Sequence, residues 1–203
     1  MAMTAAALER GRLVAVPTDT VYGIACKPEP EALKRLYAVK KREPRKPLAL
    51  VFDDMDRLIH TITRLPAPVL NAVEELLPGP VTAVLPLPGV LSQGPATAVG
   101  CGGGVGVRAL PLPAASLFQR LPSPLALTSA NLSGGPDPCS VGEIPETVGE
   151  ACEFILDGGP IAGCRASTVV DLRPLAEGKP ARILREGKMP ADRIADLIGP
   201  VEE

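Results

Sequence analysis

Short apolar segments recur along this chain of 203 residues, and they limit its fold more than any other feature. They are rich in Val, Ile and Leu, which favours β-strands. Between several of them, apolar residues recur at helical spacing, and strands that alternate with helices are typical of α/β proteins. Some links, such as Asp171 to Arg182, are too short for a helical crossover between parallel strands. We therefore expect an α/β fold with a mixed parallel and antiparallel sheet.

The pattern gives approximate bounds for each element, and no linker is long enough to divide residues 1–203 into two domains. The expected strands are Leu13–Val16, Leu48–Phe52, Val81–Leu85, Val105–Arg108, Leu125–Thr128, Phe154–Leu156, Thr168–Leu172 and Arg182–Leu184. The expected helices are an amphipathic one over residues 1–12, then Pro30–Lys40, Ala67–Leu77, Ala114–Leu121 and Pro190–Ile198.

Charge and hydropathy exclude several classes of protein. The net charge is −2 and the isoelectric point about 5.6, whereas domains that bind nucleic acid stably usually carry a clear basic excess. No apolar run approaches the roughly 18 residues of a membrane span, and the N-terminus lacks the apolar core of a signal peptide. We expect no membrane association and a cytoplasmic location. A longer natural precursor, and with it a mitochondrial form, stays open.

The cysteines and the single histidine argue against metal and disulfide chemistry. The cysteines are odd in number and widely spaced, with no CxxC pair: Cys26, Cys101, Cys139, Cys152 and Cys164. This spacing predicts neither a disulfide framework nor a zinc site, and it favours a reducing compartment. His60 lies in a helical-looking stretch and is expected at the surface, so there is little scope for a Ser-His-Asp triad.

Polar residues gather where three of the apolar segments begin or end. The run Leu125–Leu127 leads into Thr128, Ser129, Asn131 and two glycines, and Leu13–Val16 leads into Pro17-Thr18-Asp19-Thr20. From Lys40 to Lys46, five basic residues in seven positions precede the strand at 48–52. Ligands in open α/β sheets collect at the carboxyl ends of strands. Hydroxyls beside a basic cluster suit a phosphate-rich ligand.

Each of these signals also has a structural interpretation. Lys40, Arg42 and Lys46 could form a solvated basic surface at a helix C-terminus, where positive charge is favourable. Ser129 and Asn131 could cap a turn. Arg108, which follows an apolar run, could belong to a structural ion pair.

Eight motifs in a fixed order add a resemblance that covers about Leu13 to Gly187. They are PTDTVYGIAC, the Lys-x-Arg of KKREPRKPL, LPGPVT, VGVR, LTSANLSG, the DGG at 157–159, STVVD and ILREG. Together they resemble the YrdC family of threonylcarbamoyl-AMP synthases. The resemblance implies a single YrdC-like catalytic domain over residues 1–203. Its twisted mixed sheet is flanked by helices and encloses a concave, positively lined cavity.

The resemblance also implies a nucleotidyltransferase reaction. Members of the family combine L-threonine, bicarbonate or CO₂, and ATP into L-threonylcarbamoyladenylate and pyrophosphate, for the threonylcarbamoyladenosine modification of tRNA. A separate tRNA threonylcarbamoyl transferase takes over the product. Mg²⁺ is expected as a cofactor that arrives with ATP, held by few protein carboxylates, and no metal-binding residues are expected in the chain.

By the same resemblance, individual residues take roles. The catalytic set is Lys40, Arg42, Ser129 and Asn131; the ATP-binding set is Arg42, Lys46, Ser129, Asn131 and Arg185; the threonine-binding set is Thr20, Arg108 and Ser167. An arginine suits the carboxylate of an amino acid because its guanidinium can donate two parallel hydrogen bonds.

Departures from the family pattern concern individual ligand contacts and not the class of reaction. Val51 stands where some relatives have a histidine facing threonine, Gly104 where some have a nucleotide-contacting threonine, and Asp137 where some have serine. Two other functions stay open. One is carbamoyl-adenylate formation, as in hydrogenase-maturation carbamoyltransferases, and the other is a non-enzymatic RNA-binding module, which the negative net charge disfavours.

Overall fold

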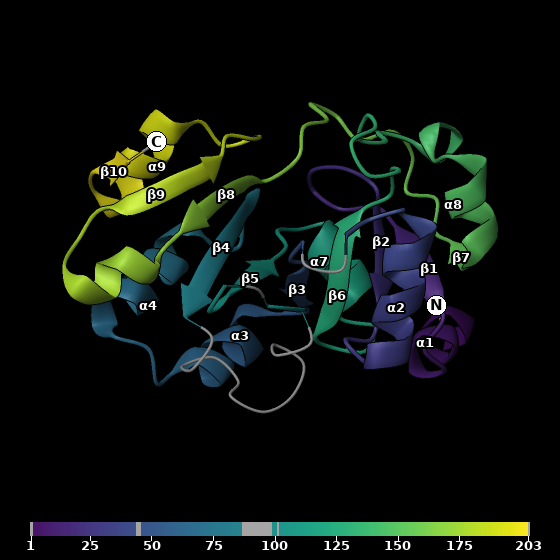
Figure 1. Ribbon diagram of the computed structural model, residues 1–203, viewed down its shortest axis with the longest axis horizontal. Coiled ribbons are helices and arrows are strands. Elements are labelled where there is room, and N and C mark those ends of the chain that lie inside the picture. Colours follow the sequence, from purple (N-terminus) through teal and green to yellow (C-terminus); the bar gives the residue numbers. More distant parts are fainter. Residues whose placement is uncertain (1, 44–45, 87–98, 101, 203) are drawn as a thin grey trace.

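The computed structural model describes residues 2–43, 46–86, 99–100 and 102–202, and one sheet runs through it (Figure 1). The sheet has 10 strands in the order β10-β9-β8-β4-β5-β3-β6-β2-β1-β7. The strands are β1 (Leu13–Val16), β2 (Gly23–Cys26), β3 (Ala49–Phe52), β4 (Val81–Pro86), β5 (Gly104–Ala109), β6 (Leu125–Ser129), β7 (Cys152–Ile155), β8 (Thr168–Asp171), β9 (Ala181–Arg185) and β10 (Val201–Glu202).

The sheet is mixed, as the short links predicted. β3 pairs with β5, and β4 with β8, in parallel, whereas β6 pairs antiparallel with both β2 and β3. Strands β1, β2 and β5 are buried along their whole length, which explains why their sequences are continuously apolar or small rather than alternating.

Two apolar clusters cover opposite faces of the sheet, because successive side chains of a strand point to opposite sides. On the first face, β2, β3 and β5 pack against the helices α2 (Pro30–Val39), α3 (Met55–Ile62), α4 (Ala67–Leu76), α8 (Glu146–Ala151) and α9 (Ala191–Ile198). On the second face, a smaller cluster joins α1 (Ala2–Glu9) and α7 (Ala114–Phe118) to β1, β3 and β6. Figure 1 shows α1 near the β1–β7 end of the sheet.

All eight expected strands and the five expected helices are present, with ends shifted by only a few residues. Pattern reasoning missed β2, β10, α8 and two 3-10 helices, η1 (Val141–Glu143) and η2 (Arg173–Glu177), and it gave no bounds for α3, although the stretch around His60 looked helical. β2 and α8 are short and contain small residues or glycine, and β10 has only two residues. His60 lies exposed on α3, as predicted. Within the described part of the chain, no helix combines the length and apolarity that crossing a membrane requires.

The prediction that the chain has no disulfide is wrong. Cys139 and Cys164 are bonded, with an S–S distance of 2.14 Å and a Cα–Cα distance of 5.6 Å. The two cysteines are 25 residues apart, and two loops bring them together, where the backbone N–H of Ile161 donates to the carbonyl of Cys139 at 2.8 Å. Cys26 and Cys152 are free, and Cys101 lies outside the described residues. The argument for a reducing compartment rested on free thiols and loses its support.

Candidate functional site

A cavity of about 340 Å³ opens on the second face of the sheet, beside the smaller apolar cluster. Alternate residues of β4 and β5 line it, together with consecutive residues at the end of β6 and the start of β3. Further lining residues come from the turn before β2, from β8 and β9, and from the segments next to these two strands. The described residues that line it include no carboxylate but four arginines: Arg42, Arg108, Arg173 and Arg185. Such a cavity is suited to an anionic ligand.

The end of α2 determines how the basic segment is arranged. Lys40 is the last, half-helical residue, and Lys41 follows with a left-handed φ of 49°. The N–H of Lys41 donates to the carbonyl of Ala38 at 3.1 Å, and that of Arg42 to Tyr37 at 2.9 Å. This is the hydrogen-bond pattern of a Schellman motif. As a result Arg42 lines the cavity, whereas Lys40 is almost completely buried.

Lys40 fixes the polar end of β6 from inside the protein. Its ammonium donates to the carbonyl oxygens of Ser129 and Asn131 and to Asn131 Oδ1, the last at 2.9 Å. Burial, reinforced by the positive charge of Arg42, lowers the pKa of Lys40 to about 8, and the negative charge of Asp137 acts in the opposite direction. Lys40 is not among the described residues that line the cavity.

Ser129 and Asn131 are linked by a direct hydrogen bond, in which the Ser129 hydroxyl donates to Asn131 Oδ1 at 2.7 Å. The Asn131 amide donates to the carbonyl of Gly135 at 2.6 Å, which closes the loop after β6. Ser129 lines the cavity, and Asn131 lies behind it. The two interpretations considered for these residues therefore combine, because the turn-stabilising contact is also what orients Ser129.

Arg42 and Arg185 have neutral hydrogen-bond acceptors. Arg42 Nη2 donates to the carbonyl of Pro47, and Arg185 Nη2 donates to the carbonyl of Ser167 at 2.8 Å. Arg42 Nε is buried and has no hydrogen-bond partner among the described residues. Burial lowers the pKa of Arg42, and the nearby charge of Arg185 lowers it further. Lys46, placed in the predicted ATP-binding set, is exposed and does not line the cavity.

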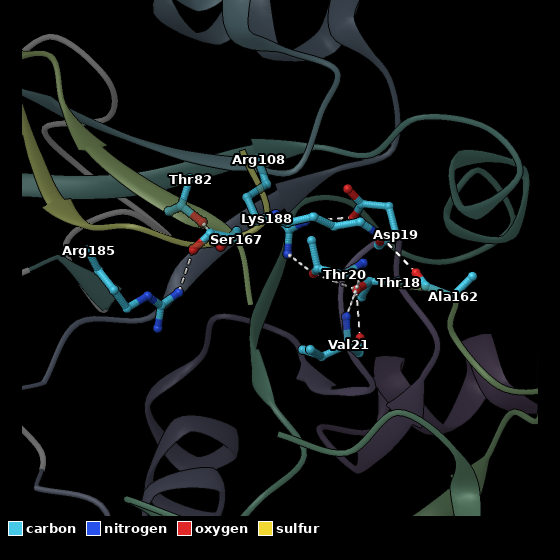
Figure 2. A network of polar contacts seen from close by, with 10 residues as sticks. All are labelled: Thr18, Asp19, Thr20, Val21, Thr82, Arg108, Ala162, Ser167, Arg185 and Lys188. Atoms are coloured by element: carbon cyan, nitrogen blue, oxygen red, sulfur yellow. Dashed lines mark hydrogen bonds and ion pairs between the residues drawn. The ribbon is translucent and has the colours of Figure 1, made fainter. Parts of the chain in front are cut away.

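Arg108, in contrast, is bound to an acidic residue (Figure 2). Its Nη2 lies 2.7 Å from Asp19 Oδ1, and the two side chains are only 6% and 10% exposed. Its Nη1 donates to Thr20 Oγ1 at 3.4 Å. Arg108 still lines the cavity, so the structural ion pair and the site residue are the same arginine. Burial lowers the pKa of Arg108 and raises that of Asp19, while each partner's charge acts in the opposite direction.

The turn before β2 holds Asp19 in place. Thr18 Oγ1 accepts the N–H groups of Thr20 and Val21, both at 3.1 Å, and donates to the carbonyl of Val21. Lys188 donates to the carbonyl of Asp19 at 2.6 Å and to that of Ala162 at 3.3 Å, which joins three distant segments (Figure 2). Sequence reasoning missed Asp19, although an acid between two threonines after a strand was the available signal.

A hydroxyl pair occupies the region beside Arg108. Ser167 Oγ and Thr82 Oγ1 lie 2.8 Å apart, and both residues line the cavity. Gly187 crosses the backbone of this segment so closely that a Cβ would lie 2.2 Å from the carbonyl oxygen of Ala166. Only glycine allows this crossing, which places Arg185 next to Ser167.

Two of the departures from the family pattern have a clear structural setting. Val51 is buried in the smaller apolar cluster and is the cross-strand neighbour of Arg108. Gly104 lines the cavity at the start of β5.

Comparison with known proteins places this chain in a family. The family model Sua5_yciO_yrdC, described as telomere recombination, matches residues 6–187. A threonylcarbamoyl-AMP synthase of Pyrococcus abyssi is 32% identical over 96% of this chain and 56% of its own length. One of Chromohalobacter salexigens is 37% identical over 83% of this chain and 90% of its own length.

A solved structure agrees with the sequence matches. The crystal structure of P. abyssi Sua5 complexed with L-threonine has a TM-score of 0.81 at 31% identity, over 98% of this chain and 57% of that chain. The chain thus spans little more than half the length of the Pyrococcus proteins. The similarity confirms the predicted mixed sheet flanked by helices.

Proposed function

The chain belongs to the Sua5/YciO/YrdC family, and from this premise we propose that it is a threonylcarbamoyl-AMP synthase. It joins L-threonine, bicarbonate or CO₂, and ATP into L-threonylcarbamoyladenylate and pyrophosphate. We further propose that residues 1–203 act as one catalytic domain and that the product passes to a tRNA threonylcarbamoyl transferase. A cytoplasmic location is part of this proposal.

The chemistry requires little beyond positioning and charge. The amine of threonine loses a proton and captures CO₂, which gives a carbamate. A carbamate oxygen then attacks the α-phosphorus of ATP, and the bond to the bridging oxygen breaks to release pyrophosphate. Negative charge grows on the phosphoryl oxygens and on the leaving group, so fixed cations and hydrogen-bond donors lower the barrier.

The groups around Arg42 are suited to the nucleotide. Arg42 and Arg185 face the cavity with no carboxylate partner among the described residues, and each can donate further hydrogen bonds to phosphate oxygens. Ser129 adds a hydroxyl. Lys40 and Asn131 act from behind, because they fix the backbone and the hydroxyl of Ser129. Lys46 can reach ATP only from its exposed position outside the cavity.

The groups around Arg108 are suited to threonine. Arg108 Nε is buried and finds no partner in the part of the chain that the structure describes, so the guanidinium keeps a donor beyond its bond to Asp19. The hydroxyls of Thr20 and Ser167 can bond the substrate hydroxyl, which valine lacks, and a site built around such a bond discriminates strongly. The solved relative that binds L-threonine supports this assignment by analogy.

Mg²⁺ would enter with ATP. The described lining residues offer hydroxyls and arginines but no carboxylates. Magnesium bound by phosphates and water fits such a surface better than a dedicated protein site does. When bound, the ion neutralises charge on the phosphates.

The observation that carries the proposal is the arginine-lined cavity in a chain whose family model covers residues 6–187. The test is pyrophosphate release from ATP with threonine and bicarbonate added singly and together, with the adenylate identified by mass spectrometry. We expect turnover only when both are present. Turnover with carbamoyl phosphate and no threonine would favour the carbamoyl-adenylate function, and tRNA binding without any turnover would favour the RNA-binding module.

A further inference from the structure

Arg173 lines the cavity although nothing in the sequence pattern or the family resemblance pointed to it. It follows β8 at the start of a short 3-10 helix, η2 (Arg173–Glu177). Its side chain is 35% exposed, so the guanidinium is accessible from the cavity.

Three hydrogen bonds hold the guanidinium of Arg173 in one orientation. Nε and Nη2 donate to the two oxygens of the buried Asp171, at 2.8 and 2.7 Å. Nη1 donates to the carbonyl of Gly102 at 2.8 Å. A guanidinium has five N–H groups, so two remain for a ligand. Holding the side chain in advance reduces the entropy lost when a ligand binds.

Gly104 provides the space in which this guanidinium lies. A Cβ at Gly104 would be 3.1 Å from Arg173 Nη1, 3.3 Å from Arg173 Cδ and 2.9 Å from Val84 Cγ1. A side chain at this position would crowd both Val84 and Arg173, and these neighbours would have to shift to make room for it. The guanidinium of Arg173 can therefore take this position because residue 104 has no side chain.

The register of the sheet places Arg173 on the side of the cavity that holds Ser129 and Arg42. Ala49 pairs with Gly106 on one side and with Leu127 on the other. Gly104 lies two residues before Gly106 on β5. In the same register, the residue beside it on the β3 side is Pro47, and the residue beside Pro47 on the β6 side is Ser129. Arg42 is bonded to the carbonyl of Pro47.

We propose that Arg173 is a further nucleotide-binding residue that contacts phosphate oxygens of ATP with the N–H groups left free by Asp171 and Gly102. This rests on the proposed function for the identity of the nucleotide. The contact adds a third arginine to Arg42 and Arg185 around the polyphosphate. Gly104 is required because it leaves room for that arginine.

The test measures binding without turnover, by calorimetry with ATP, pyrophosphate, adenosine and L-threonine. In Arg173→Gln we expect the Kd values for ATP and pyrophosphate to rise about tenfold, the typical loss for a hydrogen bond to a charged group. The Kd values for adenosine and L-threonine should stay within twofold of those of the wild type. Arg182→Gln is the matched control, because Arg182 is exposed and paired with Glu202 on the neighbouring strand.

Gly104→Ser is the second variant: it keeps the charge of Arg173 but crowds its guanidinium, and it should also weaken the binding of ATP. Unchanged ATP binding in both folded variants would overturn the proposal. A loss of affinity for adenosine alone would also overturn it. Equal losses of affinity for threonine and ATP would overturn it too, because they would indicate only a structural role. A wild-type protein that binds ATP but never releases pyrophosphate would instead contradict the proposed function.

Discussion

The arginines of the cavity differ in what neutralises them. Around Arg42 and Arg185 the partners are neutral carbonyl oxygens, and the two positive charges disfavour each other. Around Arg108 the partner is Asp19, in an ion pair buried on both sides. We call the first group, with Ser129, the nucleotide end, and the second, with Thr20, Thr82 and Ser167, the amino-acid end.

This difference indicates two kinds of ligand in one cavity. Unpaired cations in a partly buried site are stabilised by an anion of high charge, such as a polyphosphate. A guanidinium that is buried together with its carboxylate, as Arg108 is with Asp19, favours a ligand with little net charge, such as a zwitterionic amino acid. Arg173 is also paired with a carboxylate, Asp171, but its side chain is 35% exposed, and it would add hydrogen bonds to a polyphosphate whose charge Arg42 and Arg185 balance. The net charge of each end, rather than any single arginine, therefore distinguishes the two ligands.

The largest expected effect concerns stability, because the disulfide connects the loop after the nucleotide end to the segment before Ser167. Replacing Cys139 with Ser opens a loop of 25 residues and should cost about 3 kcal/mol of unfolding free energy. Denaturant unfolding measures this cost. Cys152→Ser is the control, and the activity of the folded fraction should be unchanged in both. Loss of activity without loss of stability would place the disulfide in the chemistry.

Removing cations at the nucleotide end should have the next largest effect. Lys40→Met removes the ammonium from three acceptors, of which only Asn131 Oδ1 keeps a second donor among the described residues, the Ser129 hydroxyl, and Arg42→Ala removes a donor from the cavity. Each should lower kcat/KM for ATP at least tenfold, about 1.4 kcal/mol. Lys41→Gly is the control, since it removes a charge from the same segment where glycine suits the φ of 49°. If all three variants behaved alike, bulk charge alone would matter.

Asp19→Asn should make the amino-acid end resemble the nucleotide end. Arg108 then becomes a buried cation without a carboxylate. We expect sulfate to compete with threonine about fivefold more strongly than in the wild type, because the unpaired cation attracts anions. Inhibition kinetics with varied threonine measure this, and Asp19→Glu should restore the wild-type pattern. Equal sulfate sensitivity in Asp19→Asn and wild type would contradict the claim that Asp19 distinguishes the amino-acid end from the nucleotide end.

The smallest expected effect is a pH dependence confined to the nucleotide. Burial and the charge of Arg42 lower the pKa of Lys40 to about 8, so about half of the free protein lacks this proton at pH 8. Bound phosphates favour the charged form, so ATP binding should take up roughly half a proton at pH 8, and affinity should fall as pH rises through 8. Calorimetry in buffers of different ionisation enthalpy measures the uptake, and threonine binding should show none.

Local sequence patterns predicted the parts of the site that local geometry controls. Arg42 follows the end of α2, and Ser129 is the last residue of β6. The order of helices and strands therefore predicted that both residues lie at the same edge of the sheet. The left-handed residue that ends α2 is Lys41 rather than glycine, so no sequence pattern indicated that Lys40 would be buried while Arg42 lines the cavity. The pairing of Arg108 with Asp19, the position of Arg173 and the Cys139–Cys164 bond depend on contacts between distant segments. Spacing along one chain does not contain that information.

The salt dependence of binding tests the difference between the two ends most directly. Calorimetry of wild-type protein with ATP and, separately, with L-threonine should be run from low to high sodium chloride. Screening weakens the attraction between separate charges, so we predict that ATP affinity falls about tenfold or more while threonine affinity changes less than about twofold. Equal salt dependence for both ligands would contradict the assignment of Arg42 and Arg185, which have only neutral acceptors among the described residues, to the nucleotide and of Arg108, neutralised by Asp19, to the amino acid.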